Sequence, residues 1–222
     1  MSYGFSAISN SNYILIDDSY DNYAYYSSGS VLASNSSVSA PITYDPSADI
    51  VLVRSDTYNV GIYIYAFGFS SGSTALYLRT DSASNITVEY IIIRKYSTVS
   101  INNNTYGLNI YKPDGNVAYS SSIKVGTIQA AVNLTPTQDG SYTTLTASIP
   151  GAPIGSKKRY FSILEARHTG FIWNGSQGSV ISRLGKFVTN NSFTTYCLAT
   201  SLSGFPVNAN FGSYKTFLIM DV

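Results

Sequence analysis

The single imidazole of the sequence, His168, is the side chain best suited to general-base catalysis near neutral pH. A catalytic triad would combine it with Glu165 or an aspartate as the orienting acid and with one of the many serines as the nucleophile. No G-x-S-x-G motif marks such a serine. We therefore interpret His168 as a surface or interface histidine in a strand pair, and we expect no enzymatic activity.

Glycan hydrolysis would need two carboxyl groups that flank the scissile bond. The sequence has two glutamates, Glu89 and Glu165, and they fall at different places in the internal repeat described below. Aspartates could replace them, so a glycan depolymerase remains an alternative to a non-enzymatic protein.

Side chains that could hold a metal ion are few. Asp17, Asp18 and Asp21 form the densest acidic cluster, but they lack the loop spacing and the later bidentate glutamate of an EF-hand. Cys197 is the only cysteine, which excludes an intramolecular disulfide, and one cysteine with one histidine does not make a zinc site. We expect solvated carboxylates in turns, without a metal or a cofactor.

Charge is scarce in this chain of 222 residues, of which only 11% are charged. Soluble domains usually contain about 25%. The 13 Lys and Arg nearly balance the 12 Asp and Glu, so the basic excess of a nucleic-acid-binding protein is missing. The one basic run, Lys157 to Arg159, indicates the solvent-exposed start of a strand. A contact with phosphate or an anionic glycan is the alternative.

Apolar segments are short. The run from Tyr90 to Ile93 is among the longest, far below the roughly 20 residues that cross a bilayer, so we expect no membrane insertion. The N-terminal residues lack the basic and apolar regions of a signal peptide, and we predict none.

Tyrosine, with 20 copies, is the most informative residue type, because its apolar ring and polar tip suit protein interfaces. Four tyrosines lie within seven positions and form the candidate interface: Tyr20, Tyr23, Tyr25 and Tyr26. On a strand, Tyr23 and Tyr25 share a face and Tyr26 lies opposite. The alternative is that they are half-core, half-rim aromatics of a small sandwich.

The elements that carry these residues are predicted to be strands. Apolar and polar residues alternate over 61–69, where Tyr63, Tyr65, Phe67 and Phe69 would share one face. Further β-branched and aromatic runs occur at 13–16, 50–53, 76–78, 86–93, 159–164 and 216–220, separated by Ser, Gly, Asn and Asp. This spacing predicts an all-β protein with antiparallel sandwich domains, Ig-like or jelly-roll-like.

A hairpin is predicted around 112–116, where Asp114-Gly115 suits a tight turn. A shift of 103 residues places the N-terminal segment from Tyr3 on the segment from Tyr106, and a second, weaker match at a shift of 106 places Asn85 on Asn191. The two matches predict an internal duplication with two tandem sandwich domains, 1–101 and 104–222, joined by a linker around 102–105.

The repeated module runs from Tyr3-Gly4-Phe5 to Ile14-Leu15-Ile16-Asp17, and again from Tyr106-Gly107-Leu108 to Ser120. It resembles the opening of small proteins in the tail gene modules of tailed bacteriophages and prophages. The richness in Ser, Asn, Thr and Tyr and the scarcity of charge are also similar to viral tail and fibre proteins. The resemblance implies a virion tail component without an assigned catalytic site.

The sequence therefore leads to the hypothesis of a non-enzymatic structural or adhesion protein of a bacteriophage tail or tail tip, made in the cytoplasm of the bacterial host. Its expected partners are further copies of itself in a symmetric oligomer, other virion tail proteins and a host surface receptor. Three alternatives stay open: a receptor-binding tip that grips a host glycan or outer-membrane protein, a capsid decoration protein, and the glycan depolymerase considered above.

Overall fold

The computed structural model describes residues 6–8, 14–17, 23–70, 73–95, 108–121, 127–134, 145–149, 151, 153, 157–163, 168–173, 178–202 and 215–222. These residues form strands and no helix, so none of them belongs to a helix that could cross a membrane. The strands of residues 1–101 are β1 (Ser6–Ile8), β2 (Ile14–Asp17), β3 (Tyr23–Ala33), β4 (Ile42–Tyr44), β5 (Asp49–Ser55), β6 (Ile62–Ser70), β7 (Ser73–Thr80) and β8 (Ile86–Lys95). Those that follow are β9 (Asn109–Tyr111), β10 (Val117–Ser120), β11 (Thr127–Leu134), β12 (Leu145–Ser148), β13 (Arg159–Ser162), β14 (His168–Trp173), β15 (Gly178–Thr189), β16 (Ser192–Leu202) and β17 (Lys215–Asp221).

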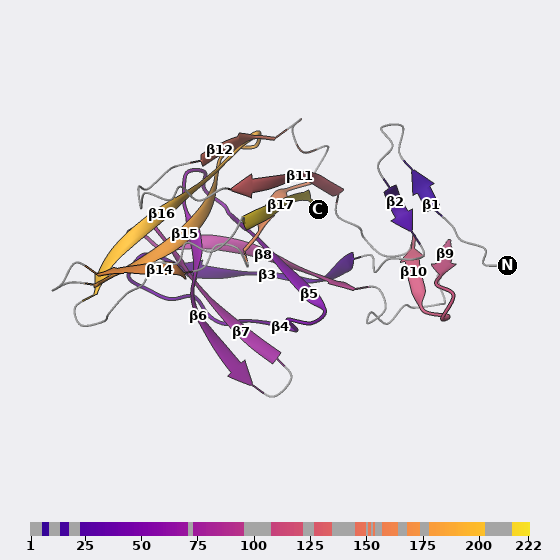
Figure 1. Cartoon of the computed structure of the whole chain (residues 1–222), viewed down its shortest axis with the longest axis horizontal. Coiled ribbons are helices and arrows are strands. Elements are labelled where there is room, and N and C mark those ends of the chain that lie inside the picture. Colours follow the sequence, from indigo (N-terminus) through magenta and orange to yellow (C-terminus); the bar gives the residue numbers. More distant parts are fainter. Residues whose placement is uncertain are drawn as a thin grey trace.

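Two antiparallel sheets pack face to face, which confirms the predicted all-β sandwich (Figure 1). The first has six strands in the order β11-β17-β13-β5-β8-β3. The second follows the path β12-β16-β15-β6-β7-β4 and gains β14 as a seventh strand on β15. Apolar side chains of both sheets form one buried cluster, to which Val53, Phe161 and Phe217 contribute from the first sheet and Ile64, Leu76 and Phe193 from the second.

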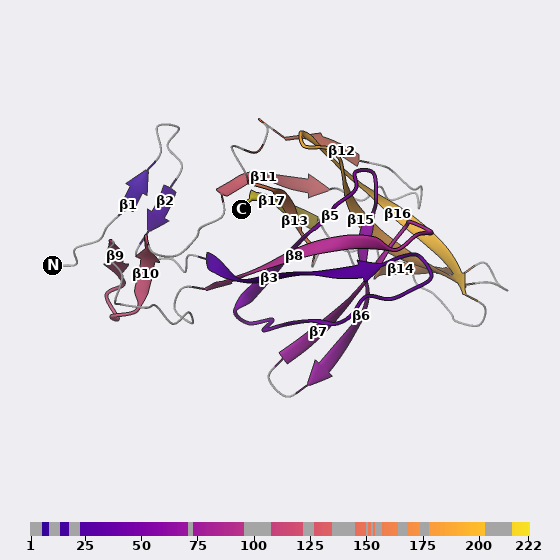
Figure 2. The same cartoon turned by 180° about the vertical axis from the view of Figure 1, so that it is seen from behind.

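Two small hairpins, β1-β2 and β9-β10, lie next to each other and apart from the sandwich in both views (Figures 1 and 2). The predicted turn is confirmed: Gly115 has a φ of 86°, and its N–H donates to the carbonyl of Lys112 over 2.9 Å. The Asp114 carboxylate accepts a hydrogen bond from the N–H of Asn116 at 2.9 Å. Glycine is needed at this turn because side chains disfavour such a positive φ.

The chain is built from two corresponding sets of strands. A shift of 103 residues carries β1 onto β9 and β2 onto β10, and it carries the pair Ser6↔Asp17 onto Asn109↔Ser120. The same shift places the bulge after Tyr25 on the bulge after Ile128. It also moves Ile42, the first residue of β4, onto Leu145, the first residue of β12. This agreement in register, bulges included, is what an internal duplication predicts.

The two sets occupy equivalent places in both sheets. β3-β8-β5 corresponds to β11-β17-β13, and β4-β7-β6 corresponds to β12-β16-β15, so that each sheet order reads symmetrically from its centre. The sets meet where β13 pairs with β5 and β15 pairs with β6. The expectation of two tandem sandwiches with cores of their own is therefore corrected: 1–101 and 104–222 each give three strands to each sheet path, but they share the sheets and the core.

One detail of the predicted repeat is wrong. The weaker match at a shift of 106 would align β8 with β16, but β8 lies in the six-stranded sheet and β16 in the seven-stranded sheet. The counterpart of β8 is β17, and among the described strands the one without a counterpart in the first set is β14. The physical reason is that the strand position is fixed by pairing partners, which local sequence similarity does not specify.

Candidate interface and its surroundings

Three of the predicted interface tyrosines, Tyr23, Tyr25 and Tyr26, lie on β3, one edge of the six-stranded sheet. Tyr23 and Tyr25 are half-buried and pack against the same apolar cluster on this sheet, as the alternation predicts. Tyr26 is 47% exposed, and its ring lies 3.5 Å from the guanidinium carbon of Arg94. Tyr20 lies outside the described residues. Tyr23 and Tyr25 thus pack within the chain, and Tyr26 is exposed.

The edge of β3 is long and uncharged. Its 11 residues contain no Asp, Glu, Lys, Arg or Pro, and β8 pairs with one side of the strand while no described strand pairs with the other. Ser28, Ser30 and Leu32 are exposed, Leu32 by 59%. β11, also without charged residues, forms the opposite edge, whereas the outermost strands of the other sheet, β4 and β12, have three and four residues. Long, uncharged edges are templates for pairing with another chain.

Beneath Tyr26, one end of the core carries a buried ion pair. Arg94 donates to Asp49 through Nε at 2.6 Å and through a second guanidinium nitrogen at 2.7 Å, while the Asp49 side chain is fully buried. The hydrogen bond from Arg94 to Asp49 raises the pKa of Arg94, and the neighbouring carboxylate charge adds to the effect. The N–H of Asp45 donates to Asp49 at 2.8 Å. Tyr26 therefore stacks on a cation whose position the carboxylate fixes.

A second buried pair occupies the corresponding place in the other set of strands. Arg159 donates to Asp221 at 2.7 and 3.0 Å, and both side chains are about 2% exposed. Another Arg159 nitrogen donates to the carbonyls of Gly151 and Asn190. The interpretation of Lys157 to Arg159 as a solvated basic run is thus wrong for Arg159, because its charge is compensated by a carboxylate brought from the end of the chain.

Glu89 is the centre of a third charged cluster, on the face of the six-stranded sheet that points away from the core. It accepts hydrogen bonds from Lys158 at 2.7 Å and from Tyr160 at 3.2 Å, and it lies 3.7 Å from Arg54. Burial alone would raise the pKa of Glu89, but the hydrogen bond from Lys158 and the charges of Lys158 and Arg54 outweigh it and lower the pKa. Burial, helped by the charge of Glu89, raises the pKa of Tyr160 to about 12.

A bulge changes the predicted face of the aromatic run in β6. The register shifts between Ile64 and Ala66, so Phe67 packs against the core together with Ile64 instead of sharing a face with Tyr63. A bulge inserts one unpaired residue and so reverses the alternation behind it. Tyr65, at the bulge, is 40% exposed and lies 3.9 Å from the guanidinium of Arg79, which adds a second exposed tyrosine on an arginine.

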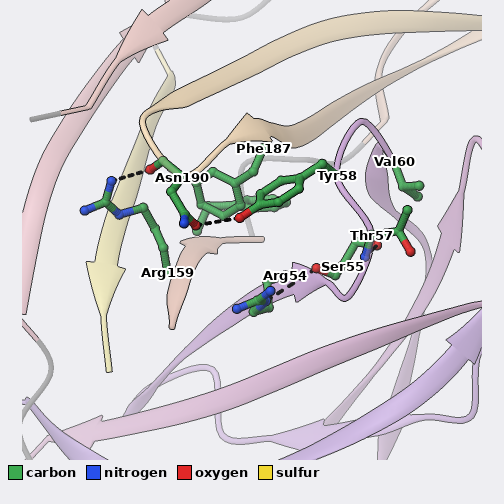
Figure 3. A pocket seen from close by; sticks show the side chains of 9 residues that line it. Arg54, Ser55, Thr57, Tyr58, Val60, Arg159, Phe187 and Asn190 are labelled. Atoms are coloured by element: carbon green, nitrogen blue, oxygen red, sulfur yellow. Dashed lines mark hydrogen bonds between the residues drawn. The ribbon is translucent and has the colours of Figure 1, made fainter. Parts of the chain in front are cut away.

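A small depression lies where the two sets of strands meet (Figure 3). Tyr58 donates to the Asn190 side chain over 2.7 Å, and the N–H of Asn59 donates to the carbonyl of Phe187. Asn59 has a φ of 63° in this loop. Arg159 reaches the same turn through the Asn190 carbonyl, as Figure 3 shows. The polar groups here bond across the junction, so we assign the depression to the joining of the two sets.

The other described residues that the sequence offers for catalysis or metal binding do not come together in one site. His168 begins β14 opposite Ser182, Cys197 lies in β16 and Asp17 ends β2. Glu165, Asp18 and Asp21 are outside the described residues, as are Gly4 and Gly107 of the repeated module. Within the described ranges, no three His, Cys, Asp or Glu side chains are placed to hold a metal ion.

The sequence reasoning missed both buried ion pairs. A signal for them exists: Asp49 is in phase with the core residues Val51 and Val53, and Arg159 is in phase with Phe161. A charged residue in the apolar phase of a strand requires a buried partner of opposite charge. The identity of that partner depends on which strands pair, so the sequence alone could not name it.

Comparison with known proteins adds no identification. The chain matches no protein-family model, and neither curated proteins nor solved structures give a significant match.

Proposed function

We propose that this chain is a non-enzymatic structural or adhesion protein of a bacteriophage tail or tail tip, and that it works as a symmetric homo-oligomer. The observation that carries the assembly part of the proposal is the uncharged, unpaired edge of β3. The resemblance of the repeated hairpin module to phage tail-module proteins supports the location in the tail. The low charge content fits a protein whose contacts are made by uncharged surface.

The β3 edge suits a second copy of the same chain. Two identical strands can pair antiparallel about a two-fold axis, and each then satisfies the backbone groups of the other. No like charges oppose each other in such a pair, because β3 has none. The chain already joins its own two strand sets in this way, through β5 with β13 and β6 with β15. Exposed Leu32 and Tyr26 would lose water contact at the new junction.

The test compares two Leu→Lys variants by analytical ultracentrifugation. Leu32→Lys places a charge on the edge strand, whereas Leu108→Lys changes a leucine of similar exposure, 57% against 59%, outside the sandwich sheets. We expect wild type and Leu108→Lys to be oligomers whose mass does not change up to about 1 M salt, since screening acts on charges. Leu32→Lys should be mainly monomeric, because charges on edge strands oppose pairing.

A wild-type monomer at tens of micromolar, or equal masses for both variants, would exclude assembly through β3. Immunogold labelling of purified particles tests the tail location separately: label on the tail supports it, and label confined to the capsid identifies a decoration protein instead.

A further inference from the structure

The two buried ion pairs sit at equivalent places with their charges reversed. In the first set of strands, the acid Asp49 begins β5 and pairs with the base Arg94 of β8. In the second set, the base Arg159 begins β13 and pairs with the acid Asp221 of β17. Equivalence follows from the sheet order, in which β5 and β13 are neighbours at the centre and β8 and β17 flank them.

The register supports this equivalence residue by residue. Leu52 pairs with Ser162 at the junction of β5 and β13, and each of the two lies three positions after the charged residue that begins its strand. Phe161 pairs with Val53, and the N–H of Ile163 donates to the carbonyl of Val51 at 3.1 Å. The contacts on either side of the pair Leu52↔Ser162 are therefore equivalent when β5 and β13 are interchanged. By this local two-fold symmetry, Asp49 and Arg159 are counterparts.

A duplicated sandwich has a pairing problem that a single sandwich lacks. β8 and β17 are both interior strands of the sheet, and next to the ion pairs they make apolar contacts, with Ile93 opposite Ile50 and Met220 opposite Tyr160. Apolar contacts of this kind tolerate exchange, because they are non-directional. β8 of one set could then take the place of β17 in the other set, within one chain or between two copies.

We propose that the reversed ion pairs determine which set of strands β8 and β17 each join. If β17 paired with β5, Asp221 would face Asp49, and if β8 paired with β13, Arg94 would face Arg159. Each exchange would bury two like charges in place of a bidentate ion pair, and buried charge without a partner is strongly unfavourable. The correct pairing is the one arrangement that neutralises all four groups. This is discrimination by repulsion against the wrong partner.

The experiment gives the ion pairs of both sets the same order of acid and base. The double variant Asp49→Arg/Arg94→Asp retains an ion pair in each set but gives both sets the same order of charges. The double variant Arg159→Asp/Asp221→Arg does the same from the other side. The quadruple variant reverses both sets and restores opposite polarity, so it is the matched control.

Wild type, the two double variants and the quadruple variant are each refolded from denaturant as a mixture of two batches that carry different dyes. Exchange of strands between copies is measured as energy transfer between the dyes. The control is a mixture of the two batches folded separately and brought to the same dilution, and only energy transfer above this control counts as exchange. We expect both double variants to give at least about twofold more exchanged or aggregated chain than wild type, because strand exchange between copies becomes permissible. The quadruple variant should return toward the wild-type yield.

Two results would overturn the proposal. The double variants could refold as cleanly as wild type, which would show that polarity does not select the partner strand. Alternatively, the quadruple variant could refold no better than the sum of the two doubles predicts, which would show that each pair acts only through its local contacts. Separate sites are normally additive, so rescue in the quadruple variant is a result that local effects do not produce.

Discussion

Replacing Gly185 by alanine should measure how closely the two sheets approach at the junction of the strand sets. Gly185 lies on β15 opposite Ile62 of β6, where the second sheet joins its two sets of strands. A Cβ atom at this position would lie 2.7 Å from Cε2 of Phe161 and 2.9 Å from Cζ of Phe193. Both rings are fully buried, so neither can move into solvent.

The expected magnitude follows from how the rings are held. The ring centroids of Phe161 and Phe193 are 5.1 Å apart. The ring of Phe161 also lies 5.7 Å from that of Phe187, and the ring of Phe193 lies 5.3 Å from that of Phe217. Overpacking of such a core costs about 1 to 3 kcal/mol. Alanine recovers about 0.4 to 1 kcal/mol by restricting the unfolded chain. We therefore expect a net loss of about 1 to 2 kcal/mol in the free energy of unfolding.

Urea unfolding of Gly185→Ala, Phe161→Leu and the double variant provides the assay. Phe161→Leu removes one of the rings that the new methyl group would meet, so the two substitutions should compensate each other by about 0.5 kcal/mol or more. Gly68→Ala is the control, because its Cβ would be 3.3 Å from a ring carbon of half-buried Tyr77, and we expect a change within about 0.5 kcal/mol. An additive double variant, or an unchanged stability for Gly185→Ala, would refute the reasoning.

Three further predictions concern charge and turn geometry. Because the pKa of Glu89 is lowered in the folded chain, its contribution to stability is present above the ordinary glutamate pKa and is lost as the pH falls through the folded pKa. The free energy of unfolding of Glu89→Gln, measured with a chemical denaturant, should therefore fall less than that of wild type between about pH 5 and 3. Asp221→Asn leaves the buried guanidinium of Arg159 without its counter-charge and should lower the free energy of unfolding by about 3 to 5 kcal/mol, while the conservative Asp56→Asn at an exposed position should be nearly neutral. Gly115→Ala places a side chain at a φ of 86° and should weaken the β9-β10 hairpin by about 1 kcal/mol, seen as faster amide exchange of Val117 to Ser120, and unchanged exchange there would contradict the role of the turn.

The strands and the turn of the β9-β10 hairpin were determined by local sequence. Alternating and β-branched runs, punctuated by Ser, Asn, Asp and Gly, located β5, β8, β13 and β17, because side-chain periodicity and turn propensity act over a few residues. The shift of 103 residues likewise identified the correspondence of β1 and β2 with β9 and β10, because the repeated hairpins keep the same turn length. The scarcity of charge also follows from composition alone.

Tertiary structure decided which strands meet. The junctions β5-β13 and β6-β15, the place of β17 as the counterpart of β8, and the reversed face of Phe67 behind a bulge all depend on pairing between distant segments. The ion pairs show the same limit: the sequence places Asp49 and Arg159 in the apolar phase of their strands, but only the pairing brings Arg94 and Asp221 to them. Side-chain periodicity says which face a residue takes, whereas its partner is selected by the free energy of the whole pair of sheets.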